Sequence, residues 1–210
     1  MPALLVLGTA VFGLEVSFYL QAYFVDTLVK VAIVVALYVF IGNSGVLSFG
    51  HVSFVALGAW TAGVLTVPAD QKAVIMPGLA HFLLHTNVGN VASLAFAAGV
   101  GAVAAFVVGL PLMRLSGLAA GIATFGVLQI TNNVLTYDRS IGPGTNAFSA
   151  VPQTTGIWQA AIGALMCVVV AFVYRSSRFG RMLRATREDP AAAAATGISI
   201  YRQRLLAFVI

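Results

Sequence analysis

The basic side chains of this chain gather in one segment. Seven of the eleven Lys and Arg residues lie between Arg175 and Arg204. Within this segment arginines recur at every third position: Arg175, Arg178, Arg181, Arg184 and Arg187. Guanidinium groups bind anions such as phosphate through paired N–H donors, and basic residues beside apolar spans meet anionic lipid. The repeat therefore predicts contact with lipid headgroups.

A three-residue arginine repeat is also typical of a voltage-sensing helix. Such a helix has apolar residues in the gaps and acidic partners on neighbouring spans. The gaps in this chain hold mostly small or polar residues, including Ser176, Ser177, Gly180 and Thr186. The acidic residues available in the apolar segments are Glu15 and Asp26. We therefore interpret the repeat as a signal for membrane orientation rather than as a sensor.

No set of residues in the sequence predicts catalysis, a metal site or a cofactor. Cys167 is the single cysteine, which excludes an intrachain disulfide and a cysteine-based metal site. His81 and His85 have the spacing of a zinc-binding pair, but further ligands are lacking nearby, and His51 has no companion. The apolar segments carry no Ser/His/Asp or paired-carboxylate constellation, and no Gly-x-x-x-x-Gly-Lys-Ser/Thr loop occurs. An enzyme is therefore not expected.

Composition decides which elements must position these residues. Hydrophobic residues make up 60% of the 210 positions and charged residues 8%, and the mean hydropathy is +0.99. These values lie outside the usage of soluble domains and predict a polytopic membrane protein. The net charge of +5 comes from basic residues beside apolar spans, which favours anionic lipid over nucleic acid as the partner.

About six apolar segments could each cross a bilayer, which takes roughly 20 residues of helix. They run over about 2–25, 25–42, 52–67, 91–113, 117–135 and 157–174. Glu15 interrupts the first, which we expect to be one tilted or imperfect helix. Glu15 either acts as an intramembrane carboxylate or lies at an interface where a short first helix ends. Asp26 and Lys30 stand at the start of the second as a possible ion pair. The start of another span follows at Leu205, so we expect an all-α helix bundle that is C-terminally incomplete.

A short polar break between the second and third segments could line a path through the membrane. It runs from Gly42 to His51 and contains Asn43 and Ser48. Irregular backbone at membrane depth must be satisfied by protein or by a water-filled cavity, and it commonly builds a substrate path. A tight turn with capped helix ends is the alternative. Three polar residues of the fifth segment could line the same path or form interhelical hydrogen bonds instead: Thr124, Gln129 and Asn132.

An alanine run within the basic segment predicts a short surface helix. Asp189 is a good N-cap, and Pro190 suits the first helical position. Ala191–Ala195 propagate the helix, and Gly197 suits its C-terminal stop. Ser199 can then cap a new helix. The smooth alanine surface could dock into a groove on another protein, or the element could be an ordinary connecting helix.

Four separated motifs give this chain a family resemblance. They are Gly45–His51 with Phe54, then Arg114–Gly117 followed by Ala123-Thr124, then Gly142–Asn146 with Pro152, and finally Ser177–Ala185 continuing through Glu188-Asp189 and Gly197-Ile198 to Leu206–Phe208. In this order and spacing the chain, from about Val25 to Ile210, resembles the permease subunits of bacterial branched-chain amino acid ABC transporters. The family's loop usually carries further acidic residues where this chain has Pro190 and Ala191–Ala195. The helix and Gly197 remain.

The resemblance implies a permease subunit of an ATP-driven importer for branched-chain or related small amino acids in the bacterial inner membrane. It implies a second permease subunit, cytoplasmic ATPase subunits and a periplasmic substrate-binding protein as partners. It would make the loop from Glu188 to Gly197 the contact with the ATPase, through Glu188, Asp189, Ala192, Ala193 and Gly197. A related importer for urea, short amides or other small organic acids is the alternative within transport, and an ion channel or a membrane-embedded enzyme lies outside it.

The basic residues predict the orientation of the chain. Residues 1–210 are expected to form a single transmembrane domain whose loop at about 175–204 is cytoplasmic, because basic residues collect on that side. Alternation then puts the loops 68–90 and 137–156 outside, and the Gly42–His51 break and the turn at Arg114 inside. The first of these loops could hold a short helix over 78–85, and Gly142–Asn146 predicts turns in the second.

Overall fold

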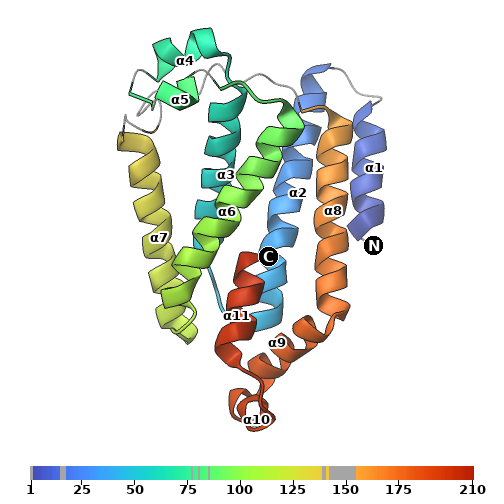
Figure 1. The fold of residues 1–210 in the computed structure, drawn as a ribbon. Coiled ribbons are helices and arrows are strands. Elements are labelled where there is room, and N and C mark those ends of the chain that lie inside the picture. Colours follow the sequence, from blue (N-terminus) through green and yellow to red (C-terminus); the bar gives the residue numbers. More distant parts are fainter. Residues whose placement is uncertain are drawn as a thin grey trace. The chain divides into compact units, whose positions relative to one another are not determined.

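The computed structural model describes residues 2–14, 18–76, 78–79, 81–84, 86–138, 141 and 155–210, and its regular elements are all helices (Figure 1). In chain order they are α1 (Pro2–Leu14), α2 (Phe18–Ser44), α3 (Gly50–Thr66), α4 (Ala69–Ile75), α5 (His81–Leu84), α6 (Asn90–Leu112), α7 (Gly117–Tyr137), α8 (Ile157–Ser176), α9 (Arg178–Glu188), α10 (Pro190–Ala195) and α11 (Ile200–Val209). Glu15, His85, Gly142–Asn146 and Pro152 lie outside the described residues, and so do the predictions made for them.

Within the described part of the chain, four helices are long and apolar enough to cross a membrane: α2, α6, α7 and α8. The longest, α2, has 27 residues and is therefore about 40 Å long, at roughly 1.5 Å per residue. Two shorter apolar helices, α1 and α3, accompany them. The predicted class, an all-α polytopic membrane protein, is confirmed.

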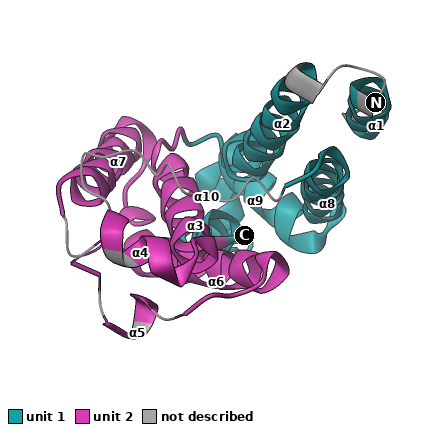
Figure 2. Ribbon diagram, turned by 90° about the horizontal axis from the view of Figure 1, so that it is seen from above, with its two compact units in different colours: residues 1–46, 153–208, 210 teal, residues 47–152, 209 magenta. Residues whose placement is uncertain are grey.

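The chain divides into two compact units (Figure 2). Unit 1 holds residues 1–46, 153–208 and 210, and unit 2 holds residues 47–152 and 209. Unit 1 is thus discontinuous in the sequence, with almost all of unit 2 inserted between its two parts. The prediction that residues 1–210 form a single domain stays a prediction.

The predicted boundary between the first and second apolar segments at Val25 is wrong. The structure ends α1 at Leu14 and starts α2 at Phe18, so Asp26 and Lys30 lie about two and three turns inside α2. No Gly or Pro interrupts the sequence between Phe18 and Ile41. The predicted ion pair is present, with Lys30 Nζ 2.5 Å from Asp26 Oδ2, and because the two charges neutralise each other on one face they do not end the helix.

The polar break is shorter than predicted. The second helix extends through Ser44 and the third begins at Gly50, which leaves residues 45–49 between them. Gly45 has φ +69°, and its N–H donates to the carbonyl of Ile41 at 3.0 Å, so a left-handed glycine ends α2. In the first predicted outside loop, α5 falls within the range 78–85, whereas α4 was not expected.

The core of unit 1 is a three-helix contact made by α1, α2 and α8. From α8 it takes residues at helical spacing: Ile157, Ala160, Ala161, Ala164 and Val168. The small alanines let the other two helices approach closely. Large apolar side chains such as Leu5 and Phe172, each 71% exposed, point away from this core, as expected of a surface that faces lipid.

In unit 2, α3 packs against both α6 and α7. Glycines bring the helix backbones together: a Cβ on Gly58 of α3 would lie 3.8 Å from the carbonyl oxygen of Ala97. A Cβ on Gly101 of α6 would lie 3.8 Å from the carbonyl oxygen of Phe54. Close backbone approach of this kind is the usual means of helix association in membranes.

Candidate functional site

The short helix α10 has a defined beginning and end. Asp189 Oδ1 accepts hydrogen bonds from the backbone N–H groups of Ala191 and Ala192, at 2.9 and 3.0 Å. At the other end, Gly197 has φ +82°, its N–H donates to Ala194, and the N–H of Ile198 donates to Ala193. These two bonds form a Schellman motif. The predicted cap, Pro190 at the first position and glycine stop are confirmed.

The alanines of α10 fall on two sides. Ala193 is buried, at 4% exposed, whereas four alanines are exposed: Ala191, Ala192, Ala194 and Ala195. Beside them Glu188 and Asp189 are also exposed, the side chain of Glu188 to 79%. The surface offered to a partner is therefore a small apolar one with two carboxylates at its N-terminal end. Gly197 is exposed at the opposite end.

The helix before it, α9, runs across the ends of α2 and α8 and leads to α10 (Figure 1). Gly180, Leu183 and Thr186 form its buried side. Ser177 caps α9 by accepting from Gly180 N at 3.2 Å. A Cβ on Gly180 would lie 2.2 Å from the carbonyl oxygen of Tyr174, so only glycine fits where α9 turns under the end of α8.

Two of the repeated arginines bind protein groups at the ends of the long helices. Arg184 Nη1 donates to Asn43 Oδ1 and to the carbonyl of Arg175, both at 3.0 Å. Arg187 Nη1 donates to the carbonyl of Gly42 at 2.9 Å. Both carbonyls belong to the last turns of their helices, where backbone acceptors lack intrahelical partners and cations are favoured.

The arginine repeat thus divides. Arg175, Arg178 and Arg181 are exposed and remain available for the predicted contact with lipid headgroups. Arg184 is half-buried, and Arg187 also lies 3.9 Å from Glu188 Oε1. The sequence marked all five residues by spacing alone, and it did not reveal that Arg184 and Arg187 hold α2 and α8.

Polar residues near the start of α3 make two sets of hydrogen bonds within unit 2. Thr124 of α7, 1% exposed, donates from Oγ1 to the carbonyl of Gly121 at 2.8 Å and accepts from the N–H of Phe49 at 3.2 Å. His51 Nδ1 lies 2.9 Å from Ser48 Oγ. The structure therefore brings Ser48, His51 and Thr124 to the same end of α3.

The other residues predicted to line a path are placed differently. Gln129 and Asn132 lie further along α7 and are exposed. Asn43 belongs to unit 1 and is 3% exposed. Its Nδ2 donates to the carbonyl of Val39 at 2.8 Å while its Oδ1 accepts from Arg184. Both polar atoms of Asn43 are thus used inside unit 1.

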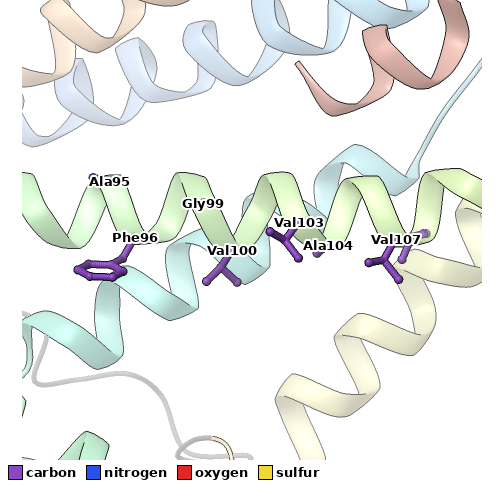
Figure 3. A pocket seen from close by; sticks show the side chains of 8 residues that line it. Ala95, Phe96, Gly99, Val100, Val103, Ala104 and Val107 are labelled. Atoms are coloured by element: carbon purple, nitrogen blue, oxygen red, sulfur yellow. The ribbon is translucent and has the colours of Figure 1, made fainter. Parts of the chain in front are cut away.

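A hollow along α6 is lined by apolar side chains, and in Figure 3 Phe96, Val100, Val103 and Val107 project from the helix along it. The remaining lining residues are alanines, Gly99 and Val108. Such a surface offers no charged group to a zwitterion. It suits an acyl chain or another apolar helix better than an amino acid.

One buried cation was not anticipated from the sequence. Lys72 of α4 is fully buried, and its Nζ donates to the carbonyls of Leu83, at 3.2 Å, and Thr86. Burial lowers the pKa of Lys72 from its ordinary value. This lysine joins α4 to the residues around α5. In the described residues, no three His, Cys, Asp or Glu side chains gather in a way that could hold a metal ion.

The helices and their packing define a polytopic α-helical membrane protein. The model of the branched-chain amino acid transport system permease component family matches residues 19–210, so the chain belongs to that family. The resemblance inferred from the four motifs is thereby confirmed.

Two curated relatives agree with this assignment. The chain is 27% identical to the high-affinity branched-chain amino acid transport system permease protein LivM of Salmonella typhimurium and 26% identical to the protein of the same name from Escherichia coli. Each match covers 88% of this chain and 47% of the relative, so the chain spans about half the length of these relatives. No solved structure matches the chain.

Proposed function

We propose that this chain acts as a permease subunit of an ATP-driven importer that moves branched-chain or related small amino acids across a bacterial inner membrane. Membership of the permease family and the names of the two relatives support the transport role. The observation that carries the importer mechanism is α10, a helix capped at both ends that presents four exposed alanines.

The proposed docking partner of α10 is a cytoplasmic ATPase subunit. Helix-in-groove recognition uses an apolar helix surface that is ordered before binding, which lowers the entropic cost of association. The contact would use Ala192 and its exposed neighbours, with Glu188, Asp189 and Gly197 at the margins. Ala193, which is buried, would contribute to the packing of α10 rather than to the surface that meets the ATPase. ATP hydrolysis would take place in the partner.

The assembly would also need a second permease subunit and a periplasmic substrate-binding protein. In this arrangement the segment 175–204 lies in the cytoplasm, where the exposed Arg175, Arg178 and Arg181 can meet anionic headgroups. Clustering of Ser48, His51 and Thr124 at one end of α3 supports their role along the translocation path, since small polar groups at membrane depth commonly line such a path. Gln129 and Asn132 would extend this lining along α7.

Cysteine crosslinking tests the docking role. In a Cys167→Ala background of the full-length chain, a cysteine at Ala194 is expected to crosslink to the co-expressed ATPase, because this side chain is exposed on α10. A cysteine at Ala193, which is 4% exposed, is expected to react far more weakly.

A cysteine at Val74 provides a second control. This residue of α4 is 81% exposed and lies in the loop predicted to be outside, so it should not reach the ATPase. If an assembly that takes up amino acid gives no crosslink from Ala194, the docking role is wrong. In a separate assay, uptake into vesicles supplied with ATPases and candidate binding proteins would identify the substrate.

A further inference from the structure

The C-terminal ends of α2 and α8 are held by the same helix, α9. Arg187 reaches the carbonyl of Gly42 in the last turn of α2, at 2.9 Å. Arg184 reaches the carbonyl of Arg175 in the last turn of α8 and the side chain of Asn43 in α2, at 3.0 Å each. Two arginines one turn apart therefore join two helices of membrane length to one short helix.

These contacts act on groups that need partners. The last four carbonyls of a helix have no intrahelical donor, and they carry the negative end of the helix dipole. A guanidinium group supplies both a positive charge and directed N–H donors. Movement of α9 away from either helix end would leave these acceptors without their cation, so α9 and the two ends are favoured to move together.

Gly45 leaves space for the contact between Arg187 and the end of α2. Gly45 follows α2 with φ +69°, and a Cβ there would lie 2.9 Å from Cγ of Arg187. Glycine at this position therefore both ends the helix and leaves room for the arginine to cross it. Asn43 is 3% exposed, and its amide is fixed from two sides, by Val39 and by Arg184.

No flexible linker separates α9 from α10. One residue, Asp189, lies between the two helices: its N–H donates to the carbonyl of Ala185 in α9, and its carboxylate and carbonyl accept from α10. Leu183 of α9 is fully buried. A displacement of α10 is therefore passed directly to α9.

We propose that Arg184 and Arg187 are positioning residues that transmit movement of α10 to the ends of α2 and α8. This inference rests on the proposed docking of α10 to an ATPase. It makes the two arginines necessary for converting ATP hydrolysis into transport but not for binding the ATPase. It also separates them from Arg175, Arg178 and Arg181 of the same repeat.

Charge-removing substitutions test the proposal with matched controls. Arg184→Gln and Arg187→Gln remove the hydrogen bonds from α9 to the ends of α2 and α8, whereas Arg202→Gln and Arg202→Ala remove the same charge from an exposed position of α11. Each is made in the full-length chain and reconstituted with its ATPases, second permease subunit and binding protein. Amino acid uptake and ATP hydrolysis are measured on the same vesicles, together with the crosslink from a cysteine at Ala194.

For Arg184→Gln and Arg187→Gln, the ratio of uptake to ATP hydrolysis is expected to fall about tenfold, a typical size for coupling between sites. The crosslink from the cysteine at Ala194 should be retained. The two control variants should stay close to the unmodified ratio. Arg187→Lys should recover part of the loss, because its ammonium group can still donate to the carbonyl of Gly42. Asn43→Ala added to Arg184→Gln should lower the ratio less than the sum of the separate effects predicts.

Three results would overturn the proposal that Arg184 and Arg187 transmit movement. The first is an unchanged ratio of uptake to hydrolysis in both Arg184→Gln and Arg187→Gln, and the second is an equal fall of this ratio in the control variants. The third is a parallel loss of uptake and hydrolysis, which would mean that the arginines only stabilise the fold. If the cysteine at Ala194 gives no crosslink to the ATPase when the arginines are unmodified, the proposed docking of α10, on which this inference rests, would be overturned instead.

Discussion

Replacing Gly180 by alanine should break the turn between α8 and α9. The added Cβ would lie 2.2 Å from the carbonyl oxygen of Tyr174, 3.1 Å from its carbonyl carbon and 3.2 Å from Cα of Arg175. All three atoms belong to the backbone, so no side-chain rotation can relieve the contact. Ordinary contact begins near 3.4 Å, and α9 must therefore move by about 1.2 Å (3.4 − 2.2) relative to α8. That shift also pulls Arg184 from the carbonyl of Arg175.

The size of the effect follows from known costs of overpacking. Such insertions destabilise by about 1–3 kcal/mol, and 1 kcal/mol lowers the Tm of a chain of this size by roughly 2–4 °C. Gly180→Ala should therefore unfold roughly 2–12 °C below the unmodified protein, by the product of these two ranges. The assay is thermal unfolding of the purified protein in detergent. Hydrogen exchange of the α9 amides should rise in parallel.

Gly163 provides the matched control. It lies in α8, as Gly180 lies in α9, but a Cβ there meets nothing within 4 Å. Gly163→Ala should leave the Tm unchanged or raise it, since alanine is favoured over glycine inside a helix by about 0.5–1 kcal/mol. A Gly180→Ala protein that unfolds at the unmodified temperature with unchanged α9 exchange would refute the reasoning.

Three further outcomes are expected. Asp189→Ala should destabilise α10 by about 1 kcal/mol through loss of its N-cap bonds, measured as faster hydrogen exchange at Ala191 and Ala192, and Asp189→Asn should restore protection. Leu183→Ala should lower the free energy of unfolding by about 2–5 kcal/mol, because the side chain is fully buried; an exposed alanine-scan position such as Arg181 should change it little. The lowered pKa of Lys72 means that its charged form is destabilised in the folded state. This destabilisation is at its full size below the folded-state pKa, where the lysine is charged in both states, and it declines as the pH rises from that pKa towards 10.5. Exchange of the α4 amides, corrected for its intrinsic pH dependence, should therefore slow over that interval, and Lys72→Met should abolish the trend.

The sequence predicted α10 well because its signals are local. Asp189, Pro190 and Gly197 each have a backbone role that their residue type favours, and these roles need no distant partner. The tie between Arg184 and Asn43 joins residues 141 positions apart, and no local pattern indicates which arginine of a regular repeat will find such an acceptor. The sequence also does not indicate which of the five alanines is buried, because burial of Ala193 depends on the residues that α10 packs against.

The boundary between the first two helices could not be predicted from local sequence. The sequence pattern places Asp26 and Lys30 at the start of the second apolar segment, and charged residues are rare within a span. The structure places both inside α2, where their mutual contact at 2.5 Å removes the reason for the helix to end. Identity of the family was accessible for a different reason: it rested on four motifs spread over most of the chain rather than on any one element.

The discontinuity of unit 1 has a consequence for biosynthesis. The acceptors at the end of α2 leave the ribosome 141 residues before Arg184, and 145 before Arg187, their cationic partners. At about 5–20 residues per second, translation separates them by roughly 7–29 s. During that interval residues 47–152, almost all of unit 2, are synthesised, and the carbonyls of Gly42 and its neighbours must rely on water, headgroups or the insertion machinery. Completion of unit 1 therefore depends on the ribosome having passed α9, and a pause before that point would prolong the exposure.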